Sequence, residues 1–409
     1  MSRTSPQAPR KAALTPLFLL AVVVAVGLNL RPPLATVGPL LESLRAATGM
    51  SYQAAGLLTT LPVMAMGALA LGSAWVLRLG MRRGMSIGLV LILLASALRG
   101  VWAEPAGLLL SALVVGVGIA LVQVLLPGVM KAGAPAAAGR LMSLYVTAIM
   151  AGAALTAAFA PLLSSGLGWQ ATMALWAVPV LPALLLWRRC APALPAVAVA
   201  PAASGGVAVA RRLRAWTLAL FFGIGTSAYT LILAWYVPYY QQLGWSAQQA
   251  GLLLAGLTAC EVAVGLAASW AVARWHDRRP LLAAVIAASL AGLACVVLAP
   301  LALAIPAMVL LGFGIGGLFP LTLVATLDHA GSPREAGVLV GFVQGVGYLI
   351  AGCMPFLAGG LRDALGGFEP AWMAMAGMML AMVPMAWRLS PRSVRAYGEA
   401  VGVEAGAAA

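Results

Sequence analysis

The amino-acid sequence predicts an all-α membrane protein that crosses the bilayer many times. Of its 409 residues, 63% are hydrophobic and 8% are charged, whereas soluble domains carry about 25% charged residues. The mean hydropathy is +1.01. Apolar stretches of about 18–25 residues, long enough to cross a hydrocarbon core of about 30 Å, recur along the whole chain. A β-barrel would instead show alternating segments of about ten residues, and the sequence has no such pattern.

Twelve apolar stretches predict twelve transmembrane helices. The first is far longer than the apolar region of a cleaved signal peptide, which spans about 7–15 residues, so we expect it to remain in the chain. The predicted helices cover residues 15–40, 53–77, 84–102, 106–129, 141–164, 169–187, 215–240, 248–272, 280–300, 304–327, 335–360 and 369–388.

The distribution of positive charge predicts the orientation of these helices. With the N-terminus placed inside, twenty of the 24 Lys and Arg residues fall in inside loops, tails or the central linker. An excess of Lys and Arg in cytoplasmic loops is the positive-inside rule. We therefore expect a multi-pass protein of the inner (cytoplasmic) membrane with both termini in the cytoplasm. The same distribution argues against nucleic acid as the reason for the net charge of +14.

The two halves of the chain resemble each other, which indicates a duplication. Residues 49–58 and 244–253 are identical at seven of ten positions, at an offset of 195. At an offset of 196, the basic cluster at 78–83 matches 274–279, and Gly116 and Gly118 match Gly312 and Gly314. Parallel repeats of six helices are the layout of the major facilitator fold. The predicted units are a cytoplasmic tail (1–13), a six-helix bundle (14–187), a cytoplasmic linker (188–213), a second six-helix bundle (214–388) and a cytoplasmic tail (389–409).

Arg31 is the most informative residue, because it lies inside the first apolar stretch between Asn29 and the pair Pro32 and Pro33. An Arg at the centre of a membrane helix costs about 2.5–3.5 kcal/mol on insertion scales, so it suggests a functional site. Each proline removes a helical hydrogen bond and favours a kink. Irregular backbone at this depth is tolerated only where it faces protein or a water-filled cavity. We expect Arg31 and Asn29 to bind substrate.

Glu261 is the second key residue, because it lies near the middle of the eighth predicted helix. An unpaired carboxyl at that depth is expected to stay protonated or to find a cation. Two interpretations remain open. Glu261 either pairs structurally between the halves, with Arg31 as a candidate partner, or couples proton movement to transport.

Other polar side chains mark helix faces that can line a cavity. Helical spacing places them on shared stripes within single predicted helices. Arg99, at the outer end of the third helix, is instead expected to extend to the lipid headgroups. The further candidates for substrate binding are Tyr229 and Tyr236 on the seventh helix, Gln344 and Tyr348 on the eleventh, and Gln123 on the fourth.

Enzymatic or metal chemistry finds no support in the sequence. The four cysteines lie far apart, without the spacing of a metal site or a disulfide framework. No pair of carboxylates and no Ser–His arrangement occupies a predicted helix. We expect no cofactor and no metal.

The sequence resembles the cyanate permease and 2-nitroimidazole transporter family of the major facilitator superfamily over roughly residues 20–388. One departure is Leu77, which stands where the superfamily signature between the second and third helices has an acidic residue. The resemblance implies a small polar or anionic solute. It is carried by residues 28–33 (Leu-Asn-Leu-Arg-Pro-Pro), 125–127 (Leu-Leu-Pro), 234–238 (Ala-Trp-Tyr-Val-Pro), 314–320 (Gly-Ile-Gly-Gly-Leu-Phe-Pro) and 345–348 (Gly-Val-Gly-Tyr).

These observations together predict a secondary active transporter that works by alternating access. Its expected partners are a small-molecule substrate, protons and the lipid bilayer, and the expected state is a monomer. The first alternative is a drug or metabolite exporter of the same fold driven by proton antiport. The second is a transporter-like receptor or membrane enzyme, for which long structured loops or a catalytic cluster would be needed.

Overall fold

The computed structural model describes residues 16–194, 209–275, 277–330 and 332–389. Every regular element within these ranges is a helix. Twelve helical segments there are long and apolar enough to cross a membrane. The predicted tail 1–13, residues 195–208 of the predicted linker and residues 390–409 of the predicted C-terminal tail lie outside the described residues.

The first half of the chain contains several short helices where spans are interrupted. Its elements are α1 (Pro16–Leu28), α2 (Pro32–Ala35), α3 (Val37–Thr48), α4 (Tyr52–Leu71), α5 (Ser73–Arg78), α6 (Met81–Val101), α7 (Pro105–Gly133), η1 (Pro135–Ala137), α8 (Ala138–Leu167), α9 (Trp169–Leu175), α10 (Val180–Cys190) and η2 (Ala191–Ala193).

The second half, in the residues that the structure describes, has six long helices. They are α12 (Leu213–Gln242), α13 (Ala247–Arg274), α14 (Arg279–Leu298), α15 (Ala304–Asp328), α16 (Pro333–Leu365) and α17 (Glu369–Trp387).

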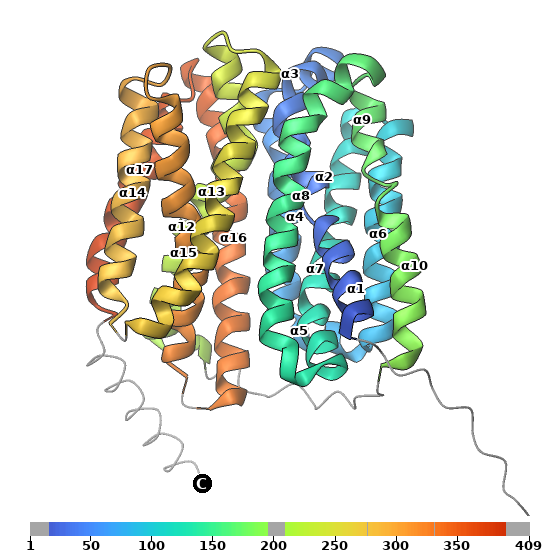
Figure 1. Ribbon diagram of the computed structural model, residues 1–409. Helices are drawn as coiled ribbons and strands as arrows, with labels where there is room; N and C mark the ends of the chain where they lie inside the picture. The colour runs from blue at the N-terminus through green and yellow to red at the C-terminus, as the bar shows by residue number, and fades with distance from the viewer. Residues whose placement is uncertain (1–15, 195–208, 276, 331, 390–409) are drawn as a thin grey trace, which may run out of the picture.

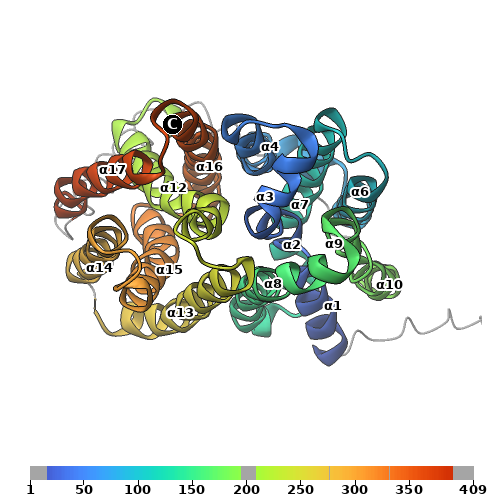
Figure 2. The same ribbon diagram turned by 90° about the horizontal axis from the view of Figure 1, so that it is seen from above.

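The helices form two bundles that stand side by side, α1 to α10 in one and α12 to α17 in the other (Figures 1 and 2). We call them the N half and the C half. Two pairs of helices make the main contacts between them, α4 with α16 and α8 with α13. The predicted fold class, twelve helices in two six-helix bundles, is confirmed.

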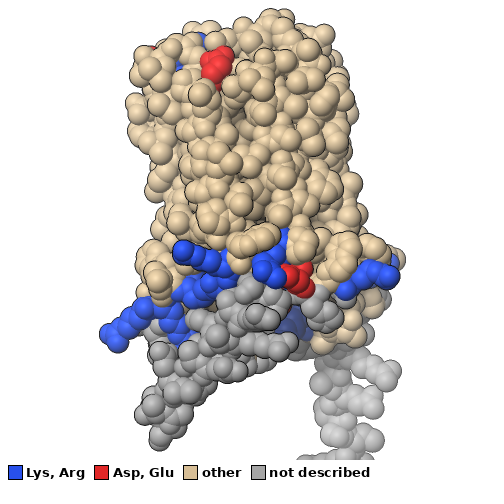
Figure 3. Space-filling view, turned by 90° about the vertical axis from the view of Figure 1, so that its left-hand side faces the viewer, with Lys and Arg blue, Asp and Glu red and all other residues tan. Residues whose placement is uncertain are grey.

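The two ends of the molecule differ in charge. Figure 3 shows Lys and Arg side chains gathered in a band near the end at which α1 begins, which we call the basic end. Exposed arginines at this end include Arg83 at the start of α6 and Arg140 at the start of α8. The opposite end, where α3 ends and α4 begins, we call the far end.

The halves are tied together at the far end. The Asp363 carboxylate in α16 accepts hydrogen bonds from the backbone N–H groups of Tyr52 (3.1 Å) and Gln53 (2.8 Å) in the N half. These are first-turn amides of α4, which have no partner within their own helix, and a negative charge there is favoured by the helix dipole. The Tyr52 ring also lies 3.4 Å from the Arg45 guanidinium carbon and 4.6 Å from that of Arg362 in the C half. The far end is therefore closed in this structure.

We predict that Asp363→Ala will loosen the far end. Losing a helix cap costs about 0.5–2 kcal/mol, and about 1 kcal/mol changes a two-state population roughly fivefold. Spin labels at exposed positions Ala47 and Leu301, one in each half, report the separation by pulsed electron resonance. We expect a new population at longer distance.

The matched control is Glu104→Ala. Glu104 is the N-cap residue of α7, but it is exposed and its side chain makes no capping hydrogen bond, so its removal should leave the distance distribution unchanged. An identical distribution in Asp363→Ala and the parent protein would mean that this contact does not hold the halves closed.

Candidate functional site

The first span is broken at the depth of Arg31, as the two prolines predict. Helix α1 ends at Leu28, and α2 begins at Pro32. The chain between them tightens, with the N–H groups of Asn29 and Leu30 donating to carbonyls three residues earlier. The Arg31 carbonyl then accepts the first bonds of α2, from the N–H groups of Leu34 (3.0 Å) and Ala35 (2.9 Å). Arg31 thus lies at the break itself.

Asn29 is buried in this break and serves the backbone. Its side-chain amide donates to the carbonyls of Ala25 (2.7 Å) and Pro179 (3.0 Å). Pro179 lies between α9 and α10, where another span is interrupted. Asn29 therefore links two broken spans, and it does not line the cavity described below.

Arg99 does not extend to the headgroups, and that prediction is wrong. Only 1% of its surface is exposed. Its Nη1 donates to the Pro33 carbonyl at 2.5 Å, and its Nε donates to Ser111 Oγ at 3.0 Å. The Pro33 carbonyl of the broken first span gives this arginine a partner inside the protein. The position of Arg99 near the end of α6 does not reveal this contact.

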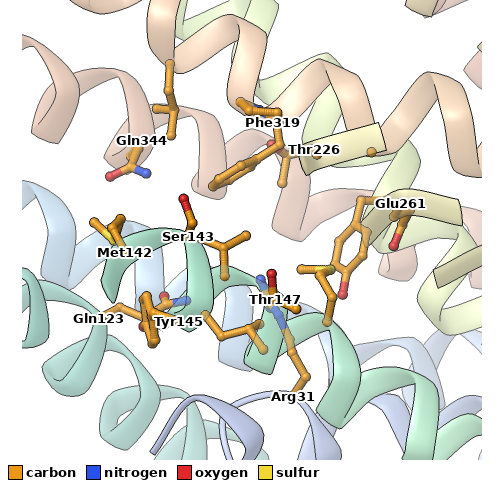
Figure 4. Close-up of a pocket in the computed structure, with 18 of the residues that line it drawn as sticks. Arg31, Gln123, Met142, Ser143, Tyr145, Thr147, Thr226, Glu261, Phe319 and Gln344 are labelled. Atoms are coloured by element: carbon orange, nitrogen blue, oxygen red, sulfur yellow. The ribbon is translucent and has the colours of Figure 1, made fainter. Parts of the chain in front are cut away.

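A cavity of about 530 Å³ lies between the two halves (Figure 4). Arg31 enters it from the N half, and Glu261 from the C half. The lining extends to Gly139 and Met142 in the first turns of α8, which are also exposed. The cavity therefore opens at the basic end, opposite the closed far end.

Arg31 and Glu261 are the two charged side chains that line this cavity. They are close enough to interact electrostatically. Among the described residues, however, the two carboxylate oxygens of Glu261 have no hydrogen-bond partner, and the Arg31 Nε has none either. The Arg31 guanidinium carbon lies 5.3 Å from the centre of the Tyr229 ring, a distance at which a cation is attracted to an aromatic face. Both side chains therefore line the cavity without pairing directly.

Close helix packing places Glu261 at the cavity wall. Gly316 of α15 lies against the backbone of Glu261, and a Cβ added to Gly316 would approach the Glu261 Cα to 2.5 Å. Only a residue without a side chain lets α13 and α15 come this close. The glycines of α15 thus set the depth and direction of the carboxyl group.

Most of the sequence-predicted binding residues reach the cavity, but Asn29 and Tyr236 do not. Tyr236 is fully buried in the C half, with its ring 5.0 Å from that of Tyr240 and 6.4 Å from that of Trp372. We therefore do not propose Tyr236 as a substrate-binding residue. The predicted residues that line the cavity are Arg31, Gln123, Tyr229, Glu261, Gln344 and Tyr348.

Other polar residues of the cavity were not among the predicted binding residues. Ser143 and Thr147 of α8 line it, as does Thr226 of α12, and Figure 4 shows Thr147 beside Arg31. The apolar ring of Phe319 of α15 also lines the cavity. The signal for the α8 pair is their spacing of four residues on one helical face. In the described part of the chain, no group of three or more His, Cys, Asp or Glu residues could hold a metal ion.

Comparison with known proteins decides the family. The family model described as Major Facilitator Superfamily matches residues 17–354. The chain belongs to this superfamily. It is 38% identical over 375 residues to the cyanate transport protein CynX of Escherichia coli (strain K12), which covers 91% of this chain and 97% of that protein. It is 34% identical over 376 residues to the 2-nitroimidazole transporter of the same organism, covering 90% and 93%.

A solved structure supports the same fold. The D-xylose-proton symporter matches with a TM-score of 0.71 at 17% sequence identity, covering 92% of this chain and 98% of that chain. The protein is accordingly a multi-pass membrane transporter, and not an enzyme.

We predict that Gly152→Ala will destabilise the site while Gly166→Ala will not. A Cβ at Gly152 would overlap the Leu28 carbonyl oxygen at the end of α1, whereas a Cβ at Gly166 meets nothing within 4 Å. Both glycines lie in α8, where alanine is favoured over glycine by about 1 kcal/mol. Overpacking costs about 1–3 kcal/mol.

Thermal unfolding of the two purified variants checks this prediction. Gly152→Ala should lower the midpoint, and Gly166→Ala should leave it unchanged or raise it. Equal midpoints would show that α8 does not need to approach the broken span closely.

Proposed function

We propose that this protein is a secondary active transporter of a small polar or anionic solute, with Arg31 as the anion anchor. The observation that carries the proposal is Arg31, which lines a cavity between the two halves and has no carboxylate partner among the residues that the structure describes. A guanidinium presents five N–H donors in a fixed fork, which suits a planar anion. The printed names of the two relatives, cyanate and 2-nitroimidazole transporters, agree with a small solute.

Hydroxyl and amide groups surround the anchor. Tyr229 and Tyr348 of the C half and Gln123 and Gln344 line the same cavity. The buried Tyr229 hydroxyl has no hydrogen-bond partner among the described residues. Unpaired buried hydroxyl groups are costly unless a ligand satisfies them. We therefore assign these side chains to contacts with the bound solute.

Glu261 is the candidate coupling residue. With Glu261 neutral, the two charged residues of the cavity carry a net charge of +1, and with Glu261 ionised the cavity is neutral overall. An anion is bound more strongly in the first state, because it then meets one uncompensated cation. Proton binding at Glu261 and anion binding near Arg31 are thus linked, which is what proton-coupled transport requires.

The orientation follows from the charge at the basic end. By the positive-inside rule, we place this end and both termini in the cytoplasm, in the inner membrane. The cavity would then be open to the cytoplasm and closed at the outer face. Alternating access would require the contacts of Asp363 and Tyr52 to separate while the basic end closes. One chain supplies all the lining residues, so we expect a monomer to be sufficient.

A proton-driven exporter of larger drugs or metabolites is the second candidate. The volume of about 530 Å³ and the aromatic lining, which includes Phe319 and Tyr229, favour it. In that case Arg31 and Glu261 would pair during the cycle and the solute would be neutral or cationic. The first candidate predicts that anion uptake depends on Arg31. The second predicts transport of a neutral or cationic solute that does not depend on Arg31.

We predict that Arg31→Ala will strongly weaken anion uptake, without abolishing it and without unfolding the protein. Charge-assisted hydrogen bonds are worth about 1.5–3 kcal/mol, so apparent affinity should fall roughly 10- to 100-fold. Uptake of labelled cyanate and of 2-nitroimidazole is measured in proteoliposomes, with folding checked by circular dichroism.

The control is Arg83→Ala, which removes an exposed arginine of the same half and should transport normally. Unchanged anion uptake by Arg31→Ala would remove the anchor role. Uptake of a neutral or cationic drug that survives in Arg31→Ala, with no anion uptake in the parent protein, would favour the exporter.

We predict that Glu261→Gln will separate coupling from exchange. The amide keeps the size of the carboxyl group but cannot change charge. Net uptake driven by a pH gradient should fall at least tenfold, while exchange of labelled for unlabelled solute should stay within about threefold, because the neutral form that favours the anion is retained. Glu104→Gln, at an exposed position outside the cavity, is the control. If net uptake and exchange fall together, coupling is not the distinct task of Glu261.

A further inference from the structure

Among the described residues, Arg99 is the one buried arginine that the proposed function leaves without a task. It lies in the last turn of α6 and does not line the cavity. Its surroundings are nonetheless specific. Nη1 donates to the Pro33 carbonyl and Nε to Ser111 Oγ, and Ser111 Oγ itself donates to the Leu108 carbonyl in α7 at 2.6 Å. One guanidinium thus ties the first span to two neighbouring helices of the N half.

The acceptor of this contact is two residues from Arg31. Pro33 belongs to α2, a helix of only four residues that lies between the break at Asn29 to Arg31 and the start of α3 at Val37. Carbonyl groups at helix ends need donors from outside the helix, and inside a membrane those donors must come from the protein. Arg99 supplies one at the segment that determines where Arg31 points.

The duplicated half provides an internal comparison. At the offset of 196 residues that relates the basic clusters, Arg99 corresponds to Cys295 and Arg31 to Ser227. In that half the corresponding helix, α12, runs without a break from Leu213 to Gln242. The break, the cavity arginine and the buried arginine thus occur together in one half, and all three are missing at the matching described positions of the other.

We propose that Arg99 is a positioning residue for the anion site. By holding the Pro33 carbonyl against α6, it fixes the break in the first span and directs the side chain at position 31 into the cavity. The geometric part stands on these contacts, and its consequence for transport rests on the proposed role of Arg31. A residue needed only for the stability of the bundle would not act selectively on position 31.

The test measures how accessible position 31 is, without using any solute. The four native cysteines (Cys190, Cys260, Cys295 and Cys353) are replaced by alanine, and Arg31→Cys is introduced. The labelling rate of this cysteine by N-ethylmaleimide is then compared with and without Arg99→Met in the purified full-length protein. We expect Arg99→Met to slow labelling at position 31 at least tenfold and Arg99→Lys, which keeps a charged donor, to slow it less than threefold.

The matched control places the cysteine at Thr147, which lines the same cavity from the unbroken helix α8. Arg99→Met should change its labelling rate less than twofold. Equal slowing at both positions would mean that Arg99 only supports the bundle, and no slowing at position 31 would mean that it does not direct that residue. Either result overturns the proposal. If Arg99→Met does not accumulate, Arg99→Gln takes its place with the same expected direction.

Transport measurements separate this inference from the proposed function. In a double-mutant cycle, Arg99→Met should raise the KM for cyanate uptake in the parent protein at least tenfold, but less than twofold in an Arg31→Ala background, since an effect that passes through Arg31 disappears with it. Additive effects would overturn the positioning role. If labelling at position 31 slows selectively but anion uptake does not depend on Arg31, the positioning role of Arg99 is supported and the anion-binding role of Arg31 is contradicted.

Discussion

The structure depends on the placement of one guanidinium inside a membrane span. A cation and irregular backbone near the middle of a bilayer are each unfavourable in lipid, so both must face protein or water. The protein meets this requirement by enclosing the break around Arg31 with side chains of its own N half. Asn29 satisfies backbone carbonyls on one side and Arg99 on the other. The Arg31 side chain itself extends to the cavity between the halves.

The duplication gives the two halves a common frame but different charges. The N half contributes the cation, at a break, and the C half contributes the carboxyl group of Glu261, on an unbroken helix set close to α15 by Gly316. A cavity with one fixed cation and one titratable acid can change its net charge by one. Asp363 and Tyr52 hold the opposite end of the same interface closed. The proposed transport cycle links these two regions, because separating the far end and closing the basic end would expose both side chains to the other side of the membrane.

Several features of the site could be read from residue types and spacing. Two adjacent prolines beside an arginine in an apolar stretch predicted a broken helix, and α1 and α2 are separated at that point. The stripe of Gln344 and Tyr348 on α16 reaches the cavity. Spacing failed for Tyr236, which shares a face with Tyr229 on α12 but lies two turns further along, where the helix packs against Trp372 instead of the cavity. The prediction for Arg99 failed because the residues around it in the sequence do not show that a carbonyl of another span lies within hydrogen-bond distance.

The sequence by itself determined the class of protein, the twelve spans and the duplicated halves, because length, hydropathy and charge act along the chain and need no knowledge of neighbours. It also identified Arg31 and Glu261 as exceptional, since charged groups at that depth are costly wherever the helix lies. Only the tertiary structure decided which polar groups satisfy one another and which are left facing the cavity. Asn29 and Arg99 each donate to a backbone carbonyl far away in the sequence, Thr147 lies beside Arg31, and Phe319 lies in the wall of the same cavity. Those choices depend on the rotation and depth at which helices pack, and close contacts such as that of Gly152 with Leu28 set them only after the bundle has formed.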